Sequence, residues 1–142
     1  MRPLLPLAFL ALAGCASTYD LTVMPRDSGR MYAGVAEDSG AGEGRISITI
    51  EERTYNGTWV ETQPGHTTAY VTGGVGFRGR VGMGGFVTVE NPAGGAAKAL
   101  LTAADGSGLR CDFAGSQGRS GGGTCRDDKG RVFDVQIRTH RG

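Results

Sequence analysis

The stretch Ile46-Ser47-Ile48-Thr49-Ile50 decides the fold of this 142-residue chain. Large apolar and polar side chains alternate along it, which is the pattern of a β-strand with one face in a core and the other in water. The charged residues 51–53 predict a turn, and residues 55–59 then run back with Tyr55 and Trp59 on one side. The sequence therefore predicts a β-hairpin over residues 45–61.

Further short alternating stretches lie on both sides of this hairpin, separated by clusters of Gly, Pro, Asn and Asp that are typical of turns. The strands expected from them cover residues 19–23, 31–36, 67–71, 86–90, 96–103, 109–113 and 132–137. Residues 96–103 also contain good helix formers, but their short length between two turns favours a strand. We predict an all-β fold, a small antiparallel sandwich or barrel with meander-like strand order. It forms a single domain over residues 19–138, followed by a tail at residues 139–142.

Two glycine-rich stretches interrupt the strand pattern. Residues 73–85 contain seven glycines with apolar residues between them, and residues 115–123 are polar and glycine-rich. Neither is a phosphate-binding loop, because the Lys-Ser/Thr ending and the following helix are missing. The first stretch is interpreted as a flexible or partly extended excursion, such as a long hairpin, or as an interaction loop with exposed apolar residues. The second is predicted to be a loop.

Few residues suggest catalytic chemistry. His66 falls in a predicted turn and His140 in the tail, with no motif around either. Asp127, Asp128 and Asp134 form a small acidic patch, a weak cation site at most, because the alternating ligands of a calcium loop are missing. We therefore expect no catalytic residues, no metal, no cofactor and no enzymatic activity.

The single tryptophan is open to two interpretations. Trp59 is expected to fill the core against the isoleucines. The alternative is an exposed platform on which a ligand stacks.

The N-terminus ends in a distinctive stretch, Leu12-Ala13-Gly14-Cys15. It follows a positive start and an apolar run of about ten residues, far short of the roughly 20 needed to span a bilayer as a helix. This segment resembles the lipobox of bacterial lipoproteins. The resemblance implies that residues 1–14 are a signal peptide, helical if ordered, and that Cys15 receives lipid chains after cleavage. Residues 15–18 would then be a lipidated N-terminus with a short tether.

The same resemblance implies a location. Ala16, rather than Asp, follows the cysteine, which by the family rule favours the periplasmic face of the bacterial outer membrane. Residues 108–138 are also similar to the endings of small proteobacterial outer-membrane lipoproteins. Without the signal segment the chain has equal numbers of acidic and basic residues, so we expect no nucleic-acid partner. The partners expected are membrane lipid, through acylated Cys15, and an envelope protein.

The remaining cysteines are Cys111 and Cys125. If Cys15 carries lipid, export to an oxidising compartment implies a disulfide between them. A redox pair or a metal site is the alternative, although the spacing is not that of C-x-x-C and no histidine lies near.

These observations suggest a lipid-anchored cell-envelope lipoprotein with a structural or accessory binding role. The alternative is a periplasmic inhibitor or ligand-binding module, for example against lysozyme-like enzymes. Known envelope lysozyme inhibitors resemble this chain only in being small and β-rich.

Overall fold

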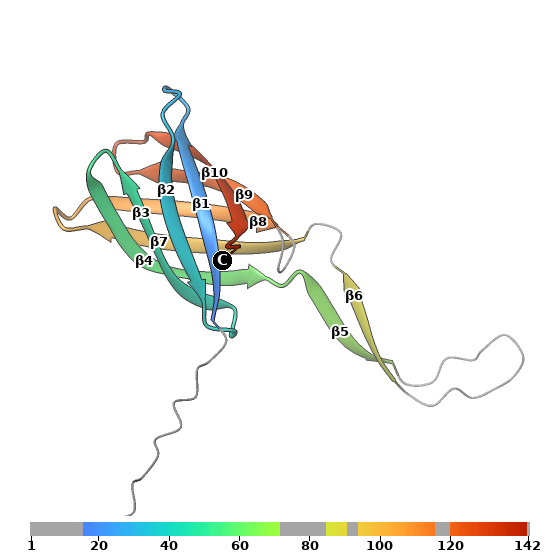
Figure 1. Cartoon of the computed structure of the whole chain (residues 1–142). Coiled ribbons are helices and arrows are strands. Elements are labelled where there is room, and N and C mark those ends of the chain that lie inside the picture. Colours follow the sequence, from blue (N-terminus) through green and yellow to red (C-terminus); the bar gives the residue numbers. More distant parts are fainter. Residues whose placement is uncertain (1–15, 72–84, 91–93, 116–119, 142) are drawn as a thin grey trace, which may run out of the picture.

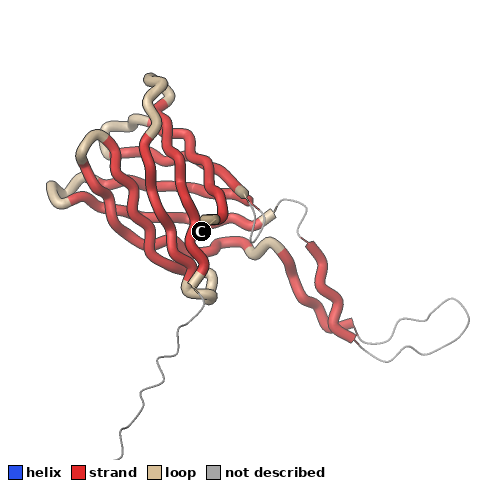
Figure 2. The backbone as a smooth tube through the Cα atoms, viewed as in Figure 1, coloured by secondary structure: helices blue, strands red, loops and turns tan. Residues whose placement is uncertain are grey.

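The computed structural model describes residues 16–71, 85–90, 94–115 and 120–141, with the backbone alone in 66–71 and 85–90. Every regular element among them is a β-strand (Figure 2). The strands are β1 (Ser17–Pro25), β2 (Tyr32–Asp38), β3 (Glu43–Ile50), β4 (Arg53–Gln63), β5 (His66–Val71), β6 (Gly85–Glu90), β7 (Gly95–Ala103), β8 (Gly108–Gly115), β9 (Gly121–Asp127) and β10 (Val132–Thr139).

Eight of these strands close into a barrel in the order β1-β10-β9-β8-β7-β4-β3-β2 (Figure 1). All neighbours are antiparallel, and β1 completes the closure by pairing with both β2 and β10. The all-β, antiparallel prediction is therefore confirmed, and of its two architectures the barrel is the one observed. The order is a meander with one interruption, where β4 pairs with β7 instead of β5.

That interruption is an excursion from the barrel. Strands β5 and β6 pair only with each other, in register from His66 opposite Glu90 to Val71 opposite Gly85. They form a two-stranded arm that extends away from the barrel wall (Figure 1). The predicted strands at 67–71 and 86–90 are thus confirmed, while most of the glycine-rich stretch at 73–85 lies outside the described residues.

The barrel interior is filled by the alternate residues that the sequence pattern predicts. Ile46, Ile48 and Ile50 of β3 are at most 5% exposed, and Tyr55 of the returning strand is also buried. Residues 96–103 belong to a strand, as predicted, and they contribute Ala99 and Leu101 to the same core. The remaining buried hydrophobic side chains come from five other strands, namely Leu21, Val23, Ala36, Leu109, Cys111, Phe113, Cys125, Phe133 and Val135.

Inward-facing glycines explain how so thin a core closes. Gly57 of β4 lies between Ile46 of β3 and Leu101 of β7, both of which are bulky. A Cβ at Gly57 would lie 1.9 Å from the Leu100 carbonyl oxygen, so only glycine permits the backbones to approach this closely. Strands that bend together at such positions can close a small barrel.

The two ends of the barrel differ. One end carries the turns after β1, β3, β7 and β9. The Arg131 side chain lies over this end and links two of these turns. Its guanidinium contacts Asp27 at 3.2 Å and Glu51 at 3.0 Å, and it lies over the Phe133 ring. Beneath it Pro25 is fully buried. This closed end is therefore plugged by side chains and covered by charged groups.

Most strands extend a few residues beyond the predicted bounds, and three of these differences change the interpretation of a segment. Residues 121–123 belong to β9, so the loop expected over 115–123 is shorter, because Gly123 faces inward between Phe113 and Val135 and needs no side chain there. Strand β1 begins at Ser17, within the expected tether. Strand β10 includes Thr139, and the His140 amide donates to the Thr18 carbonyl, which ties the expected tail to β1.

Candidate ligand-binding site at the open end of the barrel

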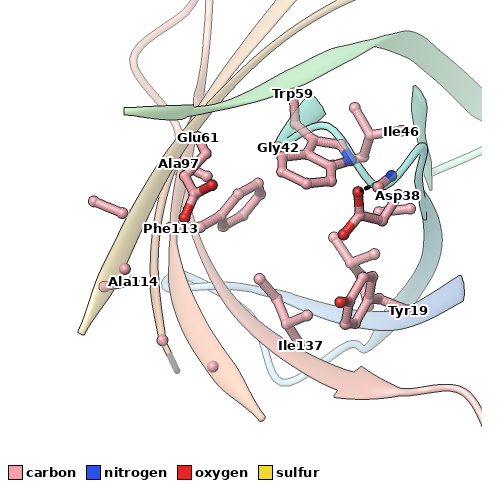
Figure 3. A pocket seen from close by; sticks show the side chains of 17 residues that line it. Tyr19, Asp38, Gly42, Ile46, Trp59, Glu61, Ala97, Phe113, Ala114 and Ile137 are labelled. Carbon is pink, nitrogen blue, oxygen red and sulfur yellow. Dashed lines mark hydrogen bonds between the residues drawn. The ribbon is translucent and has the colours of Figure 1, made fainter. Parts of the chain in front are cut away.

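The other end of the barrel contains a pocket of about 340 Å³ (Figure 3). It lies where β1 and β7 begin and where β2, β4 and β8 end, so the chain enters the barrel beside its mouth. The arm formed by β5 and β6 leaves the barrel from the same end, through the end of β4. We call this the open end.

Small residues create the pocket. On the wall formed by β7, β8 and β9, four of the inward positions near the mouth are the small residues Gly95, Ala97, Gly115 and Gly121. The alternation that fills the closed end continues here, but these residues have no side chain long enough to reach the barrel axis. The space that remains is therefore a consequence of residue size and not of a break in the strand pattern.

Larger apolar side chains, most of them aromatic, border the rest of the cavity. Tyr19 of β1, Trp59 of β4 and Phe113 of β8 border the cavity together with Ile46 and Ile137 (Figure 3). The Trp59 indole Nε1 donates a hydrogen bond to the Glu37 carbonyl oxygen at 3.0 Å, which fixes the ring orientation. Trp59 is half-buried and packs against the core, so it combines both roles considered from the sequence: its ring joins the core and also faces the cavity.

Two carboxylates lie at the mouth. Asp38 follows Ala36 and Glu61 follows Trp59 at the spacing of two that keeps a side chain on the inner face of its strand. Asp38 accepts a hydrogen bond from the Gly40 amide at 2.8 Å. The Glu61 side chain lies against Gly42. The backbone amide of Glu61 donates a hydrogen bond to the Gly42 carbonyl oxygen at 2.7 Å, which holds the two segments together. Both acids therefore project toward the cavity from fixed backbone (Figure 3).

The surroundings of the Tyr19 phenol raise its pKa. Burial raises the pKa of Tyr19 above its ordinary value of 10.0, and the negative charge of Asp38 raises it further. Tyr19 is therefore neutral at physiological pH and presents a hydroxyl to the pocket.

No histidine is among the described residues that line this site. The backbone of His66 starts β5, so it belongs to a strand and not to the predicted turn, and its side chain lies outside the described part. His140 Nδ1 lies 2.8 Å from an Asp20 carboxylate oxygen on the exposed surface.

Each of the three predicted acidic residues has its own partner. Asp127 accepts hydrogen bonds from the backbone amides of its own turn. Asp128 accepts one from the Gly108 amide, and Asp134 is paired with Arg26. Within residues 16–65, 94–115 and 120–141, no three acidic, histidine or cysteine side chains gather as a metal-binding group.

The two later cysteines form the disulfide that the sequence implied. Cys111 and Cys125 lie directly opposite each other on β8 and β9, both 1% exposed, and their sulfur atoms are bonded. The bond cross-links two neighbouring strands inside the core. Cys15, the expected lipidation site, lies outside the described residues.

Sequence reasoning singled out Trp59 but missed the pocket around it. The sequence does contain a feature that indicates the pocket. In Ala36-x-Asp38 and Trp59-x-Glu61 an acidic residue occupies the next inward position after an apolar one. A charged side chain at such a position marks the place where the apolar core ends.

Comparisons with protein-family models, with curated proteins and with solved structures give no match. In the described part of the chain, no helix is long and apolar enough to cross a membrane. The functional argument therefore depends on the geometry of the open end.

Proposed function

We propose that this chain is a lipid-anchored cell-envelope protein whose barrel binds a small, mainly apolar ligand at its open end. The observation that carries the proposal is the aromatic pocket of about 340 Å³ beside the start of β1. Ligand sites in proteins are concave, mostly apolar, and about 300–1,000 Å³ in volume. An eight-stranded barrel is just wide enough to hold one small ligand where side chains do not fill it.

The expected anchor and the pocket lie at the same end. Cys15 precedes Ser17, the first residue of β1, by two positions, and Tyr19 on that strand lines the pocket. Two residues span at most about 7 Å, since an extended chain covers about 3.3–3.6 Å per residue. Lipid on Cys15 would therefore hold the mouth of the barrel close to the bilayer surface, where apolar ligands are concentrated.

The anchor is tested by labelling cells with radioactive palmitate. We expect label in the wild-type chain and none in Cys15→Ser, which should also leave the membrane fraction. Absence of label from both, with equal solubility, would contradict the lipid-anchor part of the proposal.

The pocket is tested separately on residues 16–142, which include every barrel strand and both disulfide cysteines. Trp59 is the only tryptophan, so its fluorescence reports directly on the site during a titration with 1-octanol. We expect saturable binding that Ala97→Leu weakens by filling the cavity. The matched control is Ala33→Leu, which adds the same bulk on the exposed outer face of β2.

The inhibitor alternative, which comes from a resemblance in architecture, would be favoured by an apolar loop at residues 73–86 that becomes protected when a partner binds. Most of that stretch lies outside the described residues, and no observation favours inhibition over small-ligand binding. The barrel is therefore proposed as a binding module for a small molecule.

A further inference from the structure

We propose that the open-end pocket selects an amphiphile with an apolar body and a cationic amine headgroup. The inference deepens the proposed function and rests on it, because it names the chemical class of the ligand. It follows from the charge of the mouth, from the aromatic rings below it and from the depth of the cavity.

The charged side chains among the described lining residues have one sign. They are the carboxylates Asp38 and Glu61, and no Lys, Arg or His is among the described residues that line the pocket. A ligand with a carboxylate or phosphate headgroup would meet two like charges in a partly desolvated mouth. A protonated amine would meet two opposite charges instead.

The two acids are oriented for such a headgroup. Each occupies the last inward position of its strand, so its carboxylate stands at the boundary between the apolar cavity and water (Figure 3). Asp38 uses one acceptor site for the Gly40 amide, and a carboxylate offers about four. Acceptor capacity therefore remains on Asp38 for the N–H groups of an amine.

The aromatic rings add a second preference for a cation. Tyr19, Trp59 and Phe113 border the same cavity as the two acids (Figure 3). The faces of aromatic rings carry partial negative charge and attract cations, tryptophan most strongly. The raised pKa of Tyr19, to which Asp38 contributes, indicates that the charge at the mouth reaches the ring below it.

The cavity also limits the apolar body. At about 30 Å³ for each water-sized group, 340 Å³ holds roughly eleven such groups. A chain of about eight carbons with its headgroup at the mouth fits this volume.

The experiment compares three probes of one chain length on residues 16–142: n-octylamine, 1-octanol and octanoate at pH 7, followed by Trp59 fluorescence. We expect n-octylamine to bind about tenfold more tightly than 1-octanol, and octanoate to bind most weakly. In Asp38→Asn/Glu61→Gln, the amine and the alcohol should bind equally. Each single variant should lose part of the preference, which keeps the test available if the double variant does not fold.

The matched control is Asp112→Asn/Asp134→Asn, which removes the same charge from two exposed positions on the outer wall. It should retain the preference for the amine. Equal binding of n-octylamine and 1-octanol by the wild-type chain would overturn the inference and leave the proposed function standing. Loss of the preference in the control would also overturn it, because the effect would then follow net charge. Binding of none of the three probes would refute the proposed function itself.

Discussion

Replacing Gly57 with alanine should destabilise the barrel more than any change of similar size on its surface. Gly57 faces inward on β4, where that strand pairs with β7. The added Cβ would lie 1.9 Å from the Leu100 carbonyl oxygen and 2.7 Å from the Leu101 Cα. All of the atoms it meets belong to backbone, so no side-chain rotation can relieve the clash.

The size of the effect follows from the displacement required. An ordinary contact begins near 3.4 Å, so β7 must move by about 1.5 Å from β4. Such a shift stretches the neighbouring ladder hydrogen bonds beyond their usual 2.7–3.2 Å. Losing two or three of them, at about 1 kcal/mol each, lowers the free energy of unfolding by about 3 kcal/mol. For a barrel of this size that corresponds to a fall in Tm of about 10 °C.

The assay is thermal and urea unfolding of residues 16–142, followed by Trp59 fluorescence and circular dichroism. The control is Gly29→Ala, because a Cβ there meets nothing within 4 Å and the φ angle of Gly29 is not positive. That change should leave stability unchanged or raise it by about 0.4–1 kcal/mol through the unfolded state. If Gly57→Ala melted within a degree or two of Gly29→Ala, the close approach of β4 and β7 would be refuted.

Three further predictions concern the staple, the pocket and the arm. Reducing the bond between Cys111 and Cys125, or replacing both cysteines with serine, should lower the free energy of unfolding by about 3 kcal/mol, because the bond closes a loop of about 15 residues. The stability of the serine variant should not change further when reductant is added. An unchanged Tm in both the reduced protein and the serine variant would contradict this prediction. The change Asp38→Asn should lower the pKa of Tyr19 but leave it above 10.0, because burial is the larger cause of the raised pKa. An NMR titration that follows the Tyr19 ring resonances measures this pKa. An unaltered pKa would contradict the electrostatic interaction between Asp38 and Tyr19. Since the folded-state pKa is the higher one, Tyr19 costs no stability below pH 10, and its ionisation favours unfolding as the pH rises above 10. Excising residues 66–93 should change stability by no more than about 1 kcal/mol. A Cβ at Gly95 would lie 3.4 Å from the Gly65 amide nitrogen, so the two segments are close enough for a short turn to join β4 to β7. Failure of that variant to form the disulfide and to melt cooperatively would show that the arm is needed for folding.

The barrel wall was predictable where polar and apolar residues alternate strictly. Residues 46–50 and 132–137 carry large apolar groups at every second position, and both proved to be strands with those groups turned inward. Residues 121–123 could not be assigned in the same way. They are three successive glycines whose place in β9 is decided by the neighbours Phe113 and Val135, which lie far away in sequence.

The closure of the sheet could not be predicted either. Short-range patterns place each strand beside the next, so β4 would be expected to pair with β5. The observed pairing of β4 with β7 depends on Gly57 accepting the backbone of Leu100, a contact between residues 43 positions apart in the chain. The pocket was hidden for the same reason, because it is bounded by small residues from strands that only the closed barrel brings together.

The difference between the two ends of the barrel argues that the open end is retained for binding. At the closed end the inward positions hold large groups such as Ile50, Tyr55 and Phe133, and Arg131 covers them. At the open end most of the equivalent positions on β7, β8 and β9 hold glycine or alanine, and Phe113 is the large exception. Each unfilled position forgoes apolar burial worth about 25 cal/mol per Å², so larger residues such as leucine at Ala97 would be expected to increase stability. A chain with so few large apolar residues gains nothing in folding from leaving that space empty. The space is accounted for if a ligand fills it, which makes Ala97→Leu decisive: the variant should melt higher than wild type without ligand and bind 1-octanol more weakly.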